Sequence, residues 1–167
     1  MTNATKFGSL DHWEKGRIEI IEGDPKHYAF SNIYEVASTA KPWEKTIVGL
    51  NRQYVLEAIR AEGTSPWRTA PHDEFALVMD GEVEIRLRTV NDPRAYHQPE
   101  DQGSRPLDGE PSGQPMGVIK AKKGHMALLP ADRAYQFHAE HPSVIVLQSI
   151  KSPDSLERWA EICITTV

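Results

Sequence analysis

The fold of this chain is decided by the stretch HDEFALVMDGEVEI at residues 72–85. Residues 75–79 form a short apolar run of the length expected for a buried β-strand. Asp80 and Gly81 follow as a strong turn signal, because glycine adopts positive φ angles without a Cβ penalty. Residues 82–88 then alternate between charged and aliphatic side chains, which is the pattern of a half-buried strand. The stretch therefore predicts two strands joined by a tight turn.

Size and composition indicate one soluble domain. The chain has 167 residues and a mass of 18.8 kDa, which is enough to bury a core. Its net charge is −5, and there is no basic run or aromatic–basic array typical of nucleic-acid binding. No apolar stretch is long enough to span a membrane, and residues 1–9 lack the apolar core of a signal peptide. A single cysteine, Cys163, excludes an intramolecular disulfide. We therefore expect a cytoplasmic protein.

Residues 1–62 precede the cluster of motifs and are predicted to form an N-terminal extension. Residues 17–21 alternate weakly and predict a strand, and residues 28–34 and 46–50 are further strand candidates. Residues 51–61 are predicted to be a short helix, because four apolar residues recur there at helical spacing: Tyr54, Val55, Ala58 and Ile59. The extension is expected to pack either on the rest of its own chain or on a partner.

Residues 91–116 differ in composition from the rest of the chain. Eight of these 26 residues are Pro or Gly, and the sizeable apolar groups are only Tyr96, Leu107 and Met116. Such a segment cannot form a packed core of its own, so we predict a long surface loop. A lid or an arm that contacts a partner is the alternative, since long ordered loops are often functional.

Strand-like patterns return after this loop. Strands are predicted at residues 117–121 and at residues 143–150, which form the most apolar run of the chain. Residues 152–155 are typical of a helix start, with a proline near the first turn and an acidic residue beside the N-terminus. Residues 162–167 are β-branched and terminal, and are a candidate for pairing at a sheet edge.

Two motifs in this part of the chain resemble those of the cupin family. The first cupin motif contains a glutamate and a glycine separated by six residues, which Glu74 and Gly81 match. The second contains a glycine and a proline separated by five residues, which Gly124 and Pro130 match. Both motifs occur in the family's order, among short strands separated by turn signals. We therefore predict an all-β, cupin-like jelly roll, or double-stranded β-helix, over residues 63–167, with a few short helices.

The family's metal-ligand positions do not carry a complete ligand set in this chain. A metal-binding cupin takes three histidines and one glutamate from the two motifs, and this set suits divalent iron, manganese or nickel. Glu74 occupies the glutamate position. The histidine positions carry other residues: Arg68 and Ala70 (or Trp67 and Thr69 with a longer spacer) and Tyr135. Because a fixed cation at Arg68 repels a divalent metal, we predict a barrel that binds no metal.

Two arrangements of the interior side chains are consistent with this pattern. Tyr135 and Glu74 are candidates for a hydrogen bond inside the barrel, in place of the metal. Alternatively, a rebuilt metal site would draw on His72, Glu74, His125 and His138, although no spacing forces these residues together. The candidates for the barrel interior or a substrate channel are Trp67, Arg68, His72, Glu74 and Tyr135.

Tryptophans in the extension are the candidates for contacts with a partner. Trp13 and Trp43 both lie outside the cupin-like part of the chain, and tryptophan is favoured as an anchor at protein interfaces.

A second resemblance is carried by six segments spread over most of the chain: FGSLDH at 7–12, GRIEI at 16–20, GDPKHYAFSN at 23–32, RAEGTSPW at 60–67, HDEFA at 72–76 and ERWAEIC at 157–163. With the cupin-like core, the vacant ligand set and the aromatic extension, the chain resembles the small (alpha) subunit of two-component hydroquinone 1,2-dioxygenases. These enzymes act in bacterial degradation of para-nitrophenol and related aromatic compounds.

This resemblance implies a non-catalytic role for the chain within an enzyme. Members of the family are α2β2 heterotetramers that use non-haem Fe(II) and O₂ to open hydroquinone to 4-hydroxymuconic semialdehyde. The iron lies in the cupin of the large (beta) subunit, and the small subunit supports that subunit without holding a cofactor. Two alternatives stay open: a stand-alone cupin enzyme with a rebuilt metal site, and a metal-free cupin that binds a small molecule in its barrel.

Overall fold

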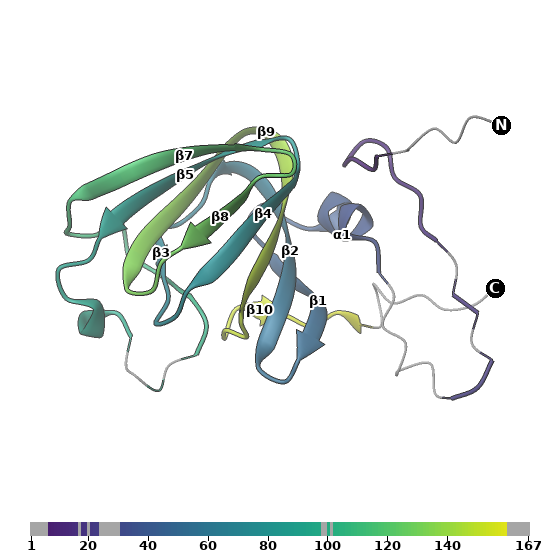
Figure 1. Cartoon of the computed structure of the whole chain (residues 1–167), viewed down its shortest axis with the longest axis horizontal. Coiled ribbons are helices and arrows are strands. Elements are labelled where there is room, and N and C mark those ends of the chain that lie inside the picture. Colours follow the sequence, from purple (N-terminus) through teal and green to yellow (C-terminus); the bar gives the residue numbers. More distant parts are fainter. Residues whose placement is uncertain are drawn as a thin grey trace.

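A strongly curled sheet of ten strands forms the body of the structure (Figure 1). The computed structural model describes residues 7–16, 18–19, 21–23, 31–97, 100 and 102–159. The strands are β1 (Lys45–Asn51), β2 (Tyr54–Thr64), β3 (Arg68–Thr69), β4 (Glu74–Asp80), β5 (Glu82–Thr89), β6 (Arg105–Pro106), β7 (Pro115–Lys122), β8 (Met126–Leu129), β9 (Arg133–Ile150) and β10 (Ser155–Leu156). Their arrangement is an all-β, cupin-like jelly roll, as the two motifs predicted.

The longest strand, β9, joins the two halves of the sheet. Its residues 143–150 pair antiparallel with β2 on one side, and residues 144–148 pair with β4 on the other. Residues 133–138 pair with β5, and the start of the strand also pairs with β3. Strands β1 and β10 extend the sheet beyond β2, β8 lies beyond β4, and β7 lies beyond β5. The two halves enclose one apolar core, to which Ile59, Ile85, Phe137 and Leu147 belong.

The two strands and the tight turn predicted at residues 72–85 are present, but the hairpin itself is wrong, because β4 pairs with β8 and β9 whereas β5 pairs with β7 and β9. The chain crosses from one half of the sheet to the other at this turn. Strands β4 and β5 meet at Gly81, which has a φ of +74°. A Cβ atom at this position would lie 2.1 Å from the Oγ atom of Ser143, so the turn requires glycine. Along β4, buried and partly exposed residues alternate: Glu74, Ala76 and Val78 point inward, whereas Phe75 and Leu77 do not. The apolar run of β4 is therefore buried on one face only.

The helix predicted over residues 51–61 is wrong, because most of this segment belongs to strand β2. Val55 and Ile59 point into the interior, and Tyr54 and Ala58 lie on the other face of the strand. A spacing of four residues fits the two-residue period of a strand as well as one helical turn, so the apolar pattern did not separate the two. Strand β2 also crosses the expected boundary between residues 62 and 63 and lies in the same sheet as the cupin-like part.

The N-terminal extension contains helix α1 (Ile33–Thr39) where a strand over residues 28–34 was predicted. Asn32 caps the helix, because its side-chain oxygen accepts hydrogen bonds from the backbone amides of Tyr34 and Glu35. Val36 packs against Ala58 on the outer side of β2. In the described residues no helix is long and apolar enough to cross a membrane.

The other predictions for the extension have mixed outcomes. Ile18, Glu19 and Ile21 lie in no strand, while residues 17, 20 and 28–30 are outside the described residues. The strand predicted at residues 46–50 is confirmed as part of β1.

The helix start predicted at residues 152–155 is also wrong. These residues form a turn that leads into β10, which pairs in parallel with β1. The side chains of Ser152, Asp154 and Ser155 bond to groups of the barrel interior, so they are not used to cap a helix. The predicted edge strand at residues 162–167 lies outside the described residues.

The described residues of the loop at 91–116 pack on the barrel beside β3. Leu107 and Tyr96 pack with Trp67, Val90 and Ala134 in a small apolar cluster. The loop contains a short 3-10 helix, η2 (Pro93–Ala95), and strand β6, and it ends where β7 begins, two residues earlier than the sequence suggested. The surface loop is therefore anchored to the body of the protein through its own apolar residues.

We predict that Gly103→Ala lowers the free energy of unfolding by about 2–4 kcal/mol. Gly103 has a φ of +72°, and a Cβ atom there would lie 2.5 Å from the Cβ of Ser152 and 2.6 Å from the carbonyl oxygen of Ile150. Gly109→Ala is the matched control, since Gly109 also has a positive φ but no atom within 4 Å of the new Cβ. It should cost only about 1 kcal/mol. Urea unfolding followed by tryptophan fluorescence measures both values, and equal losses would contradict the close packing of the loop on residues 150–152.

Candidate functional site

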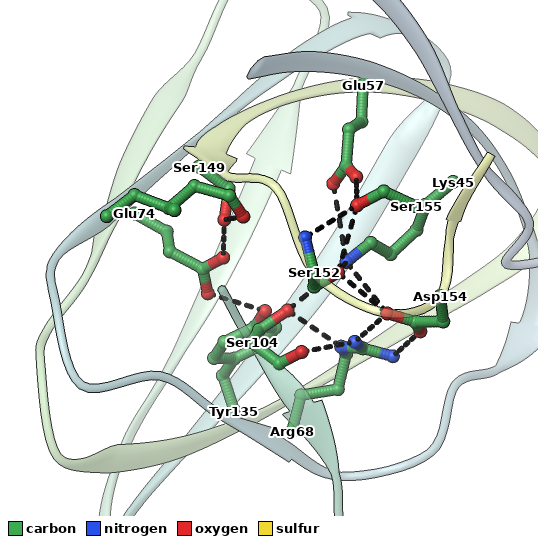
Figure 2. A network of polar contacts seen from close by, with 11 residues as sticks. Lys45, Glu57, Arg68, Glu74, Ser104, Tyr135, Ser149, Ser152, Asp154 and Ser155 are labelled. Atoms are coloured by element: carbon green, nitrogen blue, oxygen red, sulfur yellow. Dashed lines mark hydrogen bonds and ion pairs between the residues drawn. The ribbon is translucent and has the colours of Figure 1, made fainter. Parts of the chain in front are cut away.

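A network of polar and charged side chains fills the part of the barrel where a cupin metal would lie (Figure 2). Its members come from β1, β2, β3, β4, β9, β10, the 91–116 loop and the turn before β10. We call this set the interior network: Lys45, Glu57, Arg68, Glu74, Ser104, Tyr135, Ser149, Ser152, Asp154 and Ser155. Side chains far apart in the sequence therefore meet because six strands and two connecting segments converge at this end of the barrel.

Glu74 is held by two hydroxyl groups from β9. The hydroxyl of Tyr135 donates to Oε2 of Glu74 at 2.7 Å, and the hydroxyl of Ser149 donates to Oε1 at 2.5 Å. All three residues are buried. Burial raises the pKa of Tyr135 well above its ordinary value, and the charge of Glu74 raises it further. Tyr135 is therefore a neutral phenol that donates its proton, and the hydrogen bond suggested by the sequence is present.

Arg68 makes a two-pronged ion pair with Asp154. One guanidinium nitrogen lies 2.8 Å from Oδ2 of Asp154, and a second donates to Oδ1 at 3.0 Å. Arg68 also donates to the hydroxyl and the backbone carbonyl of Ser104 at 3.1 and 3.0 Å, which connects the 91–116 loop to the barrel. Such planar, bidentate pairing is the arrangement that arginine favours with carboxylates.

The pKa of Asp154 is lowered to about 2 in the folded protein. Partial burial alone would raise this pKa, but the hydrogen bond from Arg68 and the positive charges of Lys45 and Arg68 outweigh that effect. Asp154 is therefore ionised at any physiological pH.

Lys45 and Glu57 form the third part of the network. The Nζ atom of Lys45 lies 3.4 Å from Oε2 of Glu57 and donates to the hydroxyl of Ser152 at 2.6 Å. Ser155 donates a hydrogen bond to the other carboxylate oxygen of Glu57. Burial raises the pKa of Glu57, and the charge of Lys45 only partly offsets this. Lys45 and Arg68 thus lie beside Glu57 and Asp154, and Glu74 is bonded to hydroxyl groups, in a region where Asp154 is the most exposed member.

The residues of the interior network do not fit an iron ion. Both oxygens of Glu74 are engaged by hydroxyl groups, and Arg68 and Lys45 bring two positive charges into the same space. Among the described residues, no group of three or more His, Cys, Asp or Glu side chains is placed to hold a metal. Hydroxyl groups bond the buried carboxylate of Glu74 where a metal-binding cupin would use it as a ligand, as a buried charge requires.

The candidates named from the sequence separate into two groups in the structure. Arg68, Glu74 and Tyr135 come together in the interior network. Trp67 is buried elsewhere, in the apolar cluster under the 91–116 loop. His72 is half-buried at the start of β4, and its Nδ1 atom lies 2.9 Å from the backbone carbonyl of Asp73.

The rebuilt metal site suggested by the sequence is wrong for the described residues. His125 is exposed and contacts Lys122, and the Nδ1 atom of His138 lies 2.8 Å from the hydroxyl of Thr64. Neither side chain reaches Glu74, because residues 125 and 138 lie at positions where the chain does not face the interior.

The two tryptophans of the extension are both half-buried. Trp43 packs on the core with its ring stacked on that of Phe137, with 6.1 Å between the ring centroids. One face of the Trp43 ring therefore contacts Phe137 within the same chain.

Sequence reasoning missed most of the interior network. Lys45, Glu57, Ser104, Ser149 and Asp154 were not singled out. Glu57 is a charged residue at an inward position of β2, and this signal was hidden because residues 51–61 were assigned to a helix. Lys45 lies one residue before the strand predicted at residues 46–50. The serines carry no sequence signal, because serine is common on surfaces and in turns.

Solved structures similar to this chain identify its family. A chain of hydroquinone 1,2-dioxygenase PnpCD, in complex with Cd²⁺ and 4-hydroxybenzonitrile, is 51% identical with a TM-score of 0.91, and the match covers 98% of both chains. A chain of hydroquinone 1,2-dioxygenase from Sphingomonas sp. TTNP3, with 4-hydroxybenzoate bound, is 44% identical with a TM-score of 0.95 over 99% of this chain and 100% of that chain. The chain belongs to the hydroquinone 1,2-dioxygenase family. No family model and no curated protein matches it.

A second, longer chain of the same enzymes shares only the fold. A chain of hydroquinone 1,2-dioxygenase PnpCD in complex with Fe³⁺ is 13% identical with a TM-score of 0.62, and the match covers 84% of this chain but 38% of that one. The full-length matches are therefore to the shorter type of chain, and this chain is a small subunit of the hydroquinone 1,2-dioxygenase family.

We predict that Tyr135→Phe lowers the free energy of unfolding by about 1–3 kcal/mol, because it leaves Oε2 of buried Glu74 without its hydrogen-bond donor. Tyr54→Phe, at an exposed position of β2, is the matched control and should change stability by less than about 0.5 kcal/mol. Urea unfolding at neutral pH measures both. Equal stability of Tyr135→Phe and the unmodified protein would show that the Tyr135–Glu74 hydrogen bond contributes nothing.

We further predict that Asp154→Asn costs about 1 kcal/mol at neutral pH, after allowance for the screening of a carboxylate that is 43% exposed. The folded-state pKa of about 2 lies below the ordinary value of 3.8, so the stabilisation is present above pH 3.8 and is lost as the pH falls toward 2. The unmodified protein should therefore lose more stability over this range than the variant, until the two converge. Urea unfolding midpoints of both proteins, measured across this pH range, test the prediction. If the two curves of stability against pH run parallel, the Arg68–Asp154 ion pair is not the source of the pH dependence.

Proposed function

We propose that this chain is the non-catalytic small subunit of a cytoplasmic hydroquinone 1,2-dioxygenase, assembled with iron-bearing large subunits as an α2β2 heterotetramer. In the reaction, one O₂ adds to hydroquinone, the ring carbon–carbon bond beside a hydroxyl group breaks, and both oxygen atoms enter 4-hydroxymuconic semialdehyde. Ferrous iron held by the large subunit binds the phenol and O₂. The proposed pathway is the degradation of para-nitrophenol and related aromatic compounds.

The observation that carries this proposal is the match along nearly the whole chain, at 51% and 44% identity, to one of two kinds of chain in these dioxygenases. The geometry of the barrel supports the non-catalytic role. Glu74 is the one family ligand position that keeps a carboxylate, and Tyr135 and Ser149 engage both of its oxygens.

Rigidity is the property that the interior network supplies to such a subunit. Ion pairs and hydrogen bonds connect β1, β2, β3, β4, β9 and the 91–116 loop, so the barrel presents a fixed surface to its partner. We propose that Trp13 and the exposed side of Trp43 contribute to contacts with the large subunit. Trp67, Arg68 and His72 are the residues proposed to line the side of the barrel nearest the substrate channel.

Reconstitution tests this function. The purified chain is expected to show no hydroquinone cleavage with ferrous ion and O₂, because its interior carboxylate is occupied and two cations lie beside it. Addition of the large subunit should produce ring cleavage, followed by the absorbance of the semialdehyde product. The large subunit alone is the control for the contribution of this chain. Turnover by the purified small subunit alone would contradict the proposal, as would equal activity of the large subunit with and without it.

A further inference from the structure

The outer surface of one half of the sheet is apolar. The strand register aligns the outward-facing residues of β2, β9, β4 and β8 in rows across the sheet. One row consists of Leu56, Gln148, Phe75 and Leu128, and the next consists of Ala58, Val146, Leu77 and Met126. Tyr54 and Ile150 add a third row. Their neighbours along each strand point into the barrel, so these side chains point away from it. None of them is charged.

Helix α1 covers one end of this surface. Val36 packs on Ala58, and the hydroxyl of Tyr34 donates to the backbone carbonyl of Met79 at 3.3 Å. Figure 1 shows α1 and residues 7–16 on the same side of the sheet. We call the uncovered remainder the apolar sheet face: Tyr54, Leu56, Phe75, Leu77, Met126, Leu128, Val146, Gln148 and Ile150. Five of its side chains are between 39% and 66% exposed: Phe75, Leu56, Leu128, Tyr54 and Met126.

The outer surface of the other half of the sheet has a different character. Its outward positions on β5 and β7 carry Glu82, Glu84, Arg86, Lys120 and Lys122, and Glu82 and Lys122 are paired directly across the strands. That surface is what an antiparallel sheet presents to water. The apolar sheet face is therefore a local feature of β2, β9, β4 and β8, and contiguous exposed apolar area of this kind marks an interaction surface.

We propose that the apolar sheet face binds the large subunit of the dioxygenase. This inference rests on the proposed function. Two kinds of chain occur in PnpCD, and this chain matches the shorter kind over its full length, so a large apolar surface in it has a partner of different sequence to meet. A standard interface buries about 800 Å² on each partner, and the five most exposed side chains lie in three adjacent rows of this face.

The uncharged composition of the apolar sheet face indicates the composition of the partner surface that it binds. Because the face carries no charge, the matching surface of the large subunit is apolar, with a hydrogen-bonding group opposite the amide of Gln148. Permanent hetero-complexes have apolar interfaces of this kind. Their affinity depends weakly on salt, in contrast to that of an interface built on ion pairs.

Aspartate substitutions on the two outer faces test this inference. Leu56→Asp on β2 and Met126→Asp on β8 place a charge at opposite sides of the apolar sheet face, and Met126 is exposed enough that the core is untouched. Val118→Asp is the matched control, an apolar and 58% exposed strand position on the charged surface. We expect each of the first two variants to weaken binding to the large subunit about 30-fold or more, and the control to stay within about twofold. Thermal unfolding of each purified variant verifies that the barrel is intact.

The outcomes separate the possible occupants. If the unmodified subunits form a complex and both Leu56→Asp and Met126→Asp bind as tightly as the unmodified chain, the inference is overturned and the proposed function stands. If the unmodified subunits do not associate, the proposed function itself fails. If the substitutions abolish self-association of the purified chain and leave binding to the large subunit unchanged, the face belongs to a second copy and the inference is overturned. Weakened binding that high salt does not mimic supports it.

Discussion

A carboxylate buried in a β-barrel must be hydrogen-bonded or paired, and Glu74 imposes this requirement on the whole structure. Tyr135 and Ser149 on β9 meet it directly. The hydrogen bonds and ion pairs of Arg68 and Lys45 continue this network to β1, β2, the 91–116 loop and the turn before β10. Because a half-satisfied network of this kind costs more than an apolar core, its members depend on one another. The loop and the turn are held in place by the groups they contribute.

The network also explains how a cupin barrel becomes a subunit without a metal. A divalent ion in this fold depends on neutral imidazoles and a free carboxylate. In this chain, Arg68 and Tyr135 occupy two positions that carry imidazoles in a metal-binding cupin. The carboxylate of Glu74 therefore accepts a hydrogen bond from the neutral phenol of Tyr135, and Asp154 balances the positive charge of Arg68. In the proposed function, the iron chemistry belongs to the large subunit and this chain acts as its partner.

Strand β9 determines the shape on which that partnership depends. Since it pairs with both halves of the sheet, it fixes two outer surfaces of opposite character, one charged on β5 and β7 and one apolar on β2, β4 and β8. Helix α1 covers only one end of the apolar surface. The N-terminal extension is therefore integrated with the barrel through β1 and β2, and it also decides how much of the apolar surface is left uncovered.

By itself, the sequence determined the two strands and the turn at residues 72–85, the jelly-roll class and the incomplete metal-ligand set, because turn glycines, strict alternation and motif spacing are local properties. It also indicated the Tyr135–Glu74 hydrogen bond, since two motif positions of a known fold face each other. It did not show that β4 and β5 pair with β9 and not with each other, because strand pairing depends on distant segments. Only the tertiary structure decided that residues 54–64 form a strand, because apolar residues four apart satisfy both helical and strand periodicity. Only the tertiary structure joined Lys45, Glu57, Ser104 and Asp154 to the interior. Those residues carry no common spacing: the pairing of β1 with β2 places Lys45 beside Glu57, and the 91–116 loop and the turn before β10 bring Ser104 and Asp154 to Lys45.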